Sequence, residues 1–278
     1  MTSPTRLPHG NKRTESSDPL LPPQSDPPLS PRLTLPTMYD LPSEDPEEPG
    51  LPDEFHLYQP QLLRETFQPA GWNPEIIFTA AELNLYYDVR HPNWYKRPDW
   101  FAVLGVPRLY DGNNLRLSYV MWQELVSPFV VVELLSPGTE AEDLGQTTPS
   151  PEAPPSKWQV YEQILRVPYY IVFSRYTNQI QAFCLVGGEY EPVALTENRL
   201  FMPRLGLSLG LWQGEYQNIS RLWIRWLTAE GDLILTPSEQ AATAQQRAVA
   251  AEQRATAAEE RAERLAAKLR ELGMNLEE

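Results

Sequence analysis

The sequence predicts an α/β fold in which helices cover a mixed β-sheet. The segment Phe129–Leu135 is apolar on both faces apart from one glutamate, which is typical of a central strand between layers of helices. An amphipathic helical pattern from Ser156 to Pro168 follows, and the strand-like run Tyr169–Ser174 comes directly after it. A strand, a helix and a strand in this order favour α/β, with α+β as the alternative.

Residues 1–55 have the composition of a disordered arm. Thirteen of the 29 prolines lie before residue 55, and an acidic run extends from Asp40 to Glu54. Such a segment buries too little apolar surface to offset the entropy of the chain. We therefore expect an acidic, partly polyproline-like arm ahead of the folded domain.

The folded domain is expected over residues 56–236, where short β-branched and aromatic runs alternate with turn residues. Besides the two strands above, we expect strands at Glu75–Thr79, Leu83–Tyr87, Trp100–Leu104, Gln179–Leu185 and Tyr190–Leu195. Ser156 is the expected N-cap of the helix that Pro168 ends. These elements give one domain with a mixed sheet.

Residues 237–278 show a seven-residue repeat of alanine, arginine and glutamate. Gln246-Arg247-Ala248 recurs as Gln253-Arg254-Ala255 and again as Glu260-Arg261-Ala262. An unbroken a/d seam runs through Ala241, Ala244, Ala248, Ala251, Ala255, Ala258, Ala262, Leu265, Leu269 and Leu272. The repeat predicts a helix of about 30 residues. Because alanine buries little area, a coiled coil and a solitary helix both stay open, and we expect a homodimer through the core or this helix.

Several function classes are excluded by composition. The single cysteine, Cys184, allows no intramolecular disulfide, and no Cys/His cluster suits a structural zinc. The first residues have no apolar signal region and no stretch approaches a membrane span, so we expect a cytoplasmic protein that does not contact a membrane. His9, His56 and His91 lie far apart, which predicts no catalytic or metal role for them.

Two carboxylates stand out as candidates for chemistry. Asp99 lies at the head of one predicted strand, and Glu133 lies 34 residues later inside the apolar strand. A buried, ionised carboxylate is costly unless it is paired with a cation. Glu133 is therefore expected either in an ion pair with Arg97, Lys157 or Arg166, or together with Asp99 as an oxygen ligand of Mg²⁺.

These residues also resemble a known family. The ordered motifs that carry the resemblance are Pro98-Asp99, Glu133-Leu-Leu-Ser-Pro-Gly-Thr, Asp143, Lys157 with Tyr161, Val167-Pro-Tyr-Tyr and Leu205–Gly214. They are similar to the Uma-type endonucleases, catalogued as a bacterial domain of unknown function, and the resemblance covers residues 58 to 226. It implies a restriction-endonuclease-like core of the PD-(D/E)XK superfamily.

The resemblance also implies a site. Asp99 and Glu133 would bind Mg²⁺ or Mn²⁺. The lysine usual two residues after the glutamate is Leu135 here, so Lys157 is the expected substitute, with Tyr161 on the same helix face. Glu65, on a helix before the first strand, is a candidate outer metal ligand. For Asp143 two roles stay open, namely binding the metal, or capping or supporting the site without binding it.

The charge of the predicted domain is unfavourable for DNA binding. Residues 56–236 hold 13 Lys and Arg against 19 Asp and Glu, whereas DNA-binding surfaces are usually basic. Two function classes follow. The first is a metal-dependent endonuclease with weak DNA binding, and the second is a non-catalytic scaffold that keeps the nuclease-like fold.

Overall fold

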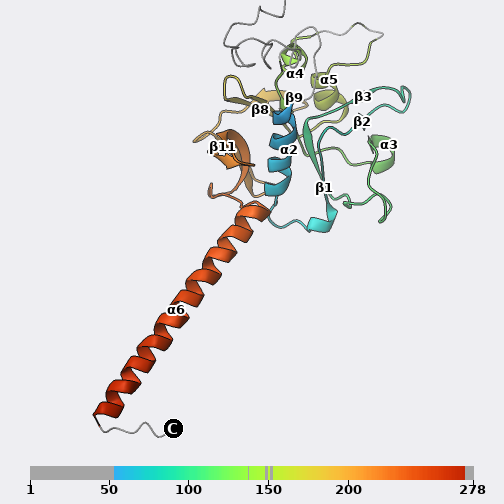
Figure 1. Cartoon of the computed structure of the whole chain (residues 1–278). Coiled ribbons are helices and arrows are strands. Elements are labelled where there is room, and N and C mark those ends of the chain that lie inside the picture. The colour runs from blue at the N-terminus through green and yellow to red at the C-terminus, as the bar shows by residue number, and fades with distance from the viewer. Residues whose placement is uncertain (1–52, 137, 148–149, 151–152, 273–278) are drawn as a thin grey trace, which may run out of the picture.

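The computed structural model describes residues 53–272 except 137, 148–149 and 151–152 (Figure 1). Residues 1–52 of the predicted arm therefore lie outside the described residues. The expected boundary of the arm at residue 55 falls inside the first described helix, α2 (Glu54–Thr66), which Asp53 caps by accepting a hydrogen bond from the His56 backbone N–H. A carboxylate is a favourable N-cap because it satisfies a helix N–H that has no partner within the helix.

The main sheet has six strands and is mixed, which confirms the predicted fold class. Its order is β1-β4-β6-β7-β8-β9, with β6 and β7 parallel and all other neighbours antiparallel. The strands are β1 (Ile77–Ala80), β4 (Trp100–Leu104), β6 (Val130–Leu134), β7 (Tyr169–Ser174), β8 (Gln179–Val186) and β9 (Glu189–Pro192). The predicted ranges for β4 and β7 match the observed ones.

Both faces of β6 are covered, as its apolar sequence predicts. Val130, Val132 and Leu134 belong to one core cluster, and Val131 belongs to a second cluster on the opposite face. Since side chains alternate along a strand, Glu133 lies on the face of Val131. That face also receives the segment after Ser156.

The helix after Ser156 begins as predicted but is not uniformly α-helical. Ser156 and Gln159 form a capping box at the start of α5 (Lys157–Gln159), and the chain continues as a π-helix, η2 (Val160–Ile164). Arg166 then adopts a left-handed φ of 54°. The helix therefore ends before Pro168, whose ring disfavours helical geometry in the preceding residue.

Two smaller sheets complete the domain. One has the order β10-β11-β12 and the other β3-β2-β5. Their strands are β10 (Arg199–Met202), β11 (Leu207–Tyr216), β12 (Ile219–Thr228), β3 (Tyr95–Lys96), β2 (Leu85–Tyr86) and β5 (Tyr119–Val120), and the short helices are η1 (Pro74–Ile76), α3 (Met121–Glu124) and α4 (Glu140–Asp143). The long hairpin β11–β12 packs against α2, since Phe55, Leu62 and Leu63 share a core cluster with Trp223 and Trp226. The predicted strand Leu83–Tyr87 is longer than the observed strand β2, which spans Leu85–Tyr86.

The predicted C-terminal helix is α6 (Pro237–Glu271), which leaves the domain and extends away from it (Figure 1). Thr236 and Glu239 form a capping box at its start. Glu239 also pairs with Arg225, whose side chain is fully buried beneath it. Among the described helices, none combines the length and apolarity that a membrane span needs.

Candidate active site

The register of β4 and β6 brings Asp99 and Glu133 together. Trp100 pairs with Val132 in this antiparallel ladder, so the residues just beyond this pair, Asp99 and Glu133, are opposite each other. The Asp99 backbone N–H lies 3.4 Å from Glu133 Oε2, and the Leu134 N–H donates a short hydrogen bond to Asp99 Oδ2. Two carboxylates far apart in sequence thus meet at one end of two paired strands.

The segment after Ser156 supplies the other two predicted residues. Lys157 Nζ lies 3.1 Å from Glu133 Oε2 and 2.8 Å from Asp143 Oδ1. The Tyr161 hydroxyl donates to Glu133 Oε1 over 2.8 Å. Lys157 and Tyr161, four residues apart, therefore hold one oxygen each of the same carboxylate. Of the three cations considered for Glu133, the structure selects Lys157 as its ion-pair partner.

Acidic groups outnumber basic groups in this cluster. Burial raises the pKa of Glu133 well above its usual range, although the Lys157 ammonium acts against that shift. Burial also raises the pKa of Asp99 to about 7, again against the pull of Lys157 and His56. For Lys157, burial alone lowers the pKa, but the charges of Glu133, Asp143 and Asp99 raise it well above its usual value. The Lys157 ammonium therefore interacts with three carboxylates, and His56 adds a second positive charge near Asp99.

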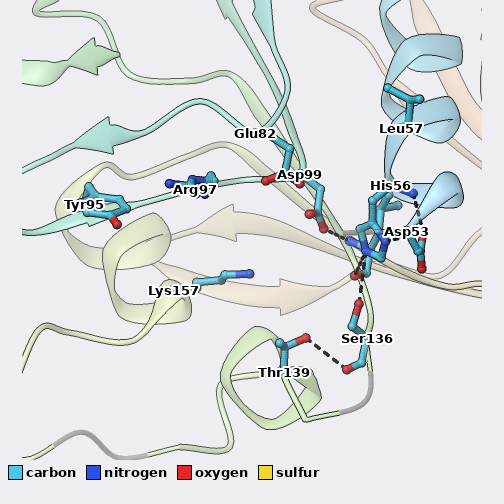
Figure 2. Close-up of a pocket in the computed structure, with 11 residues that line it drawn as sticks. Asp53, His56, Leu57, Glu82, Tyr95, Arg97, Asp99, Ser136, Thr139 and Lys157 are labelled. Carbon is cyan, nitrogen blue, oxygen red and sulfur yellow. Dashed lines mark hydrogen bonds and ion pairs between the residues drawn. The ribbon is translucent and has the colours of Figure 1, made fainter. Parts of the chain in front are cut away.

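A pocket of about 520 Å³ opens beside these groups (Figure 2). Its lining comes from the start of α2, the loop after β1, β3 and the residues that join it to β4, the end of β6 with the loop after it, and the start of α5. The lining residues are Asp53, His56, Leu57, Glu82, Tyr95, Arg97, Asp99, Leu134, Ser136, Thr139 and Lys157. Lys157 and Asp99 point toward it from opposite sides in Figure 2. Glu133 is fully buried and does not line the pocket.

His56 belongs to this pocket, although the sequence predicted no role for it. Its Nδ1 lies 3.0 Å from Asp53 Oδ1, and its Nε2 lies 3.3 Å from the Leu134 carbonyl and 3.2 Å from Ser136 Oγ. Burial alone lowers the pKa of His56, but Asp53 and Asp99 raise it to about 9. His56 is therefore a cation at neutral pH. The sequence signal that could have indicated this role is an aspartate three residues before a histidine at the start of a helix, here Asp53 and His56.

The structure does not bring Glu65 to the cluster. Its carboxylate accepts a hydrogen bond from Gln61 and lines a different pocket, next to Thr79 and Trp100. Nine residues of helix separate it from His56, a rise of about 13 Å. The helix expected to contribute a group to the site is present, but it presents His56 there.

A family model described as "Uma2: Putative restriction endonuclease" matches residues 33–220, which is more than half of the chain. The chain belongs to the Uma2 family. This confirms the resemblance drawn from the motifs, although the match begins earlier than residue 58 and ends within β12, before α6. The comparison with curated proteins found no match.

A solved structure from Anabaena variabilis resembles this Uma2 protein. That protein is described as a "putative nuclease belonging to DUF820". The sequences are 11% identical, the TM-score is 0.39, and the match covers 56% of this chain and 76% of that one. At this level the likeness adds nothing to the assignment of residues.

The donor atoms of this Uma2 site determine whether a divalent ion fits there. Within the described residues, no group of three or more His, Cys, Asp or Glu side chains is arranged to hold a metal. Asp99 and Glu133 nevertheless lie opposite each other on paired strands and offer hard oxygen ligands, in a cluster short of positive charge. Mg²⁺ commonly takes one or two carboxylates and completes its shell with water and phosphate oxygens. The residues present fit such an ion.

Some basic side chains lie at the pocket, and others are paired with acidic residues elsewhere. Arg97 and Lys157 line the pocket, and Arg175 pairs with its lining residue Asp53 over 2.7 Å. Other arginines are occupied elsewhere: Arg90 pairs with Asp88, and Arg116 with Glu124. The basic groups near the pocket are therefore few, and they share its rim with Glu82.

Proposed function

We propose that this Uma2 protein is an endonuclease that hydrolyses DNA phosphodiester bonds with Mg²⁺ or Mn²⁺. The observation that carries the proposal is that Asp99 and Lys157 line one pocket and both contact the buried Glu133. These residues come from two paired strands and a helix start, and two of them are acids in an apolar setting. Perturbed titratable groups beside a pocket are typical of catalytic sites.

Asp99 and Glu133 are the proposed holders of the ion. When bound, a divalent ion supplies Lewis acidity for the scissile phosphate and lowers the pKa of an attacking water. Lys157, protonated through its carboxylate neighbours, orients that water and offsets charge on the phosphate. Tyr161 is a positioning residue, since its hydroxyl fixes Glu133 Oε1.

DNA is the proposed substrate because the pocket presents cations able to bind phosphate. His56, Arg97 and Lys157 line it together. The surrounding acids and the excess of acidic residues in the domain weaken this attraction. Binding is therefore expected to be weak and to fall steeply as salt is raised.

A second candidate is a non-catalytic scaffold with the same fold. One observation favours it: both Glu133 oxygens are already engaged, one by Tyr161 and the other by Lys157. A closed network of this kind can be purely structural. In that case the pocket would bind neither metal nor phosphate.

Nicking of supercoiled plasmid at low salt with Mg²⁺ or Mn²⁺ tests the proposal. We expect cleavage by the wild type and none by Asp99→Ala, Glu133→Gln or Lys157→Ala, whereas the control Glu65→Gln stays active. Cleavage that survives Glu133→Gln would show that another site is responsible. No cleavage by a folded wild type with either metal would favour the scaffold.

A further inference from the structure

The helix α6 exposes a long face that contacts nothing in the monomer. Across Pro237–Glu271, all of which the structure describes, no side chain is buried. Leu265 and Leu272 on the a/d seam are 55% and 75% exposed. An apolar seam with a seven-residue period is the feature that coiled coils bury. The helix therefore carries a surface suited to another helix.

Charges flank this seam with opposite sign on its two sides. On the side that heptad nomenclature calls g, the residues are Gln240, Arg247, Arg254, Arg261 and Lys268. On the e side, they are Gln245, Glu252, Glu259 and Ala266. Every charged g residue is basic and every charged e residue is acidic. In coiled coils these two positions set partner choice and orientation.

Apart from Lys268, which has Glu271 three residues later, these flanking charges have no opposite charge within reach on their own helix. Favourable pairs within a helix lie three or four residues apart. At those distances Arg247, Arg254 and Glu252 have only uncharged neighbours, while Arg261 and Glu259 each have a like charge. The ion pair that forms within α6 joins Glu260 and Arg264, which lie away from the seam. The flanking charges are thus placed for a partner helix.

We propose that α6 binds a second copy of this chain in a parallel, in-register coiled coil. In that arrangement a g residue lies beside the e residue five positions later on the partner. Arg247 then meets Glu252 of the second copy, and Arg254 meets Glu259. In an antiparallel pair, g faces g and e faces e, so arginine would meet arginine. The charge pattern excludes that arrangement by repulsion and favours the parallel one.

A parallel coil places both domains at the same end of the assembly. The start of α6 is fixed to its domain by the capping box at Thr236 and by Glu239 on the buried Arg225. The first turn of α2, which lines the pocket, is the end of that helix farther from the start of α6 (Figure 1). The two pockets would therefore lie beyond the same end of a rod about 50 Å long. This inference does not depend on catalysis.

Sedimentation equilibrium of the full chain at low salt tests the association. We expect twice the mass of the chain for the wild type at micromolar concentration. Arg247→Glu with Arg254→Glu turns four ion pairs across the seam into repulsions, and should raise the dissociation constant by about tenfold or more. The matched control, Arg264→Glu with Arg270→Glu, changes net charge equally off the seam and should leave the dimer intact. A monomeric wild type would overturn the proposal.

Disulfide trapping tests the orientation. In a Cys184→Ala background, Ala244→Cys lies on the seam near one end of α6, so mild oxidation should join two chains only if the helices are parallel. Ala242→Cys, two residues away on the outer face, is the control and should not cross-link. A dimer in which Ala244→Cys fails to cross-link would contradict the parallel arrangement.

Discussion

At the scale of single residues, the Lys157 ammonium supplies most of the positive charge that offsets the buried carboxylates of the site. Its ammonium contacts Glu133 and Asp143, which are both almost completely buried. Removing one partner from a buried ion pair leaves an uncompensated charge, which costs more than the pair contributed. Lys157 is therefore as important for stability as for the proposed chemistry.

Replacing Lys157 with methionine is expected to lower the free energy of unfolding by about 3–5 kcal/mol at pH 7. Urea denaturation of the full chain measures the loss. Lys96→Met is the matched control, because Lys96 pairs with Glu142, which is 39% exposed, and an exposed pair contributes about 1 kcal/mol or less. Equal losses for the two variants would show that Lys157 has no special role in stability.

The charge of His56 should appear in the pH dependence of stability. Its pKa is raised from 6.5 to about 9, so the folded state binds the proton more tightly than the unfolded state. The resulting stabilisation, about 3 kcal/mol at most, is fully present below pH 6.5 and is lost as pH rises through 9. His56→Gln should therefore lose less stability between pH 6.5 and 9 than the wild type, as melting temperatures across that range would record. Parallel curves would contradict a raised pKa.

Asp99 should show the opposite relation between charge and stability. Burial raises its pKa to about 7, so its ionisation destabilises the fold progressively as pH rises from about 4 to 7. Without metal at pH 8, Asp99→Asn is expected to melt at a higher temperature than the wild type, by about 2–4 °C for each kcal/mol of destabilisation that it removes. A lower melting temperature for Asp99→Asn would show that the carboxylate is well compensated without metal.

At the scale of elements, the sequence predicted the strands best where both of their faces are buried. The ranges of β4 and β7 follow from continuous apolar runs, and the pairing of Asp99 with Glu133 follows from the strands that hold them. The hairpin β11–β12 was not predicted as strands, because Leu207–Tyr216 contains glycines and polar residues at irregular spacing. Its burial depends on α2, which is a long-range contact that no local pattern reveals.

The helical segment that holds Lys157, α5 followed by η2, could be predicted only in part. The N-cap Ser156 has a local signature, but the change to a π-helix at Val160 has none. The role of His56 depends on Leu134 and Ser136, about 80 residues away. Local sequence therefore predicted the acids and the lysine, and missed the group that three-dimensional packing adds.

The capping box at Ser156 gives a prediction for this element. Ser156→Ala removes the side-chain oxygen that accepts from the Gln159 N–H, and should cost about 1 kcal/mol of stability. Thermal denaturation measures it, with Ser156→Asp as a control that keeps an acceptor. If both variants lost equal stability, the hydrogen bond would not be the cause.

At the scale of the whole molecule, a compact domain and a free helix are joined by a small buried contact. The domain core includes no residue of α6, and the link runs through Arg225, Glu239 and Thr236. Stability of the domain and association through α6 are thus separable properties.

Truncating the chain after Gln246 keeps that link and removes the rest of the helix. The melting temperature of the domain should change by less than about 2 °C, since the removed residues contact none of the core. Calorimetry at low concentration measures this without a contribution from association. A large drop would show that the distal part of α6 supports the domain directly.

Metal binding tests the central claim most directly, namely that Asp99 and Glu133 form a divalent-cation site. Isothermal titration of the full chain with Mn²⁺ should detect one or two bound ions in the wild type, loss of binding in Asp99→Asn and in Glu133→Gln, and unchanged binding in Glu65→Gln. Binding that persists undiminished in both site variants, or a folded wild type that binds no Mn²⁺, would contradict the account.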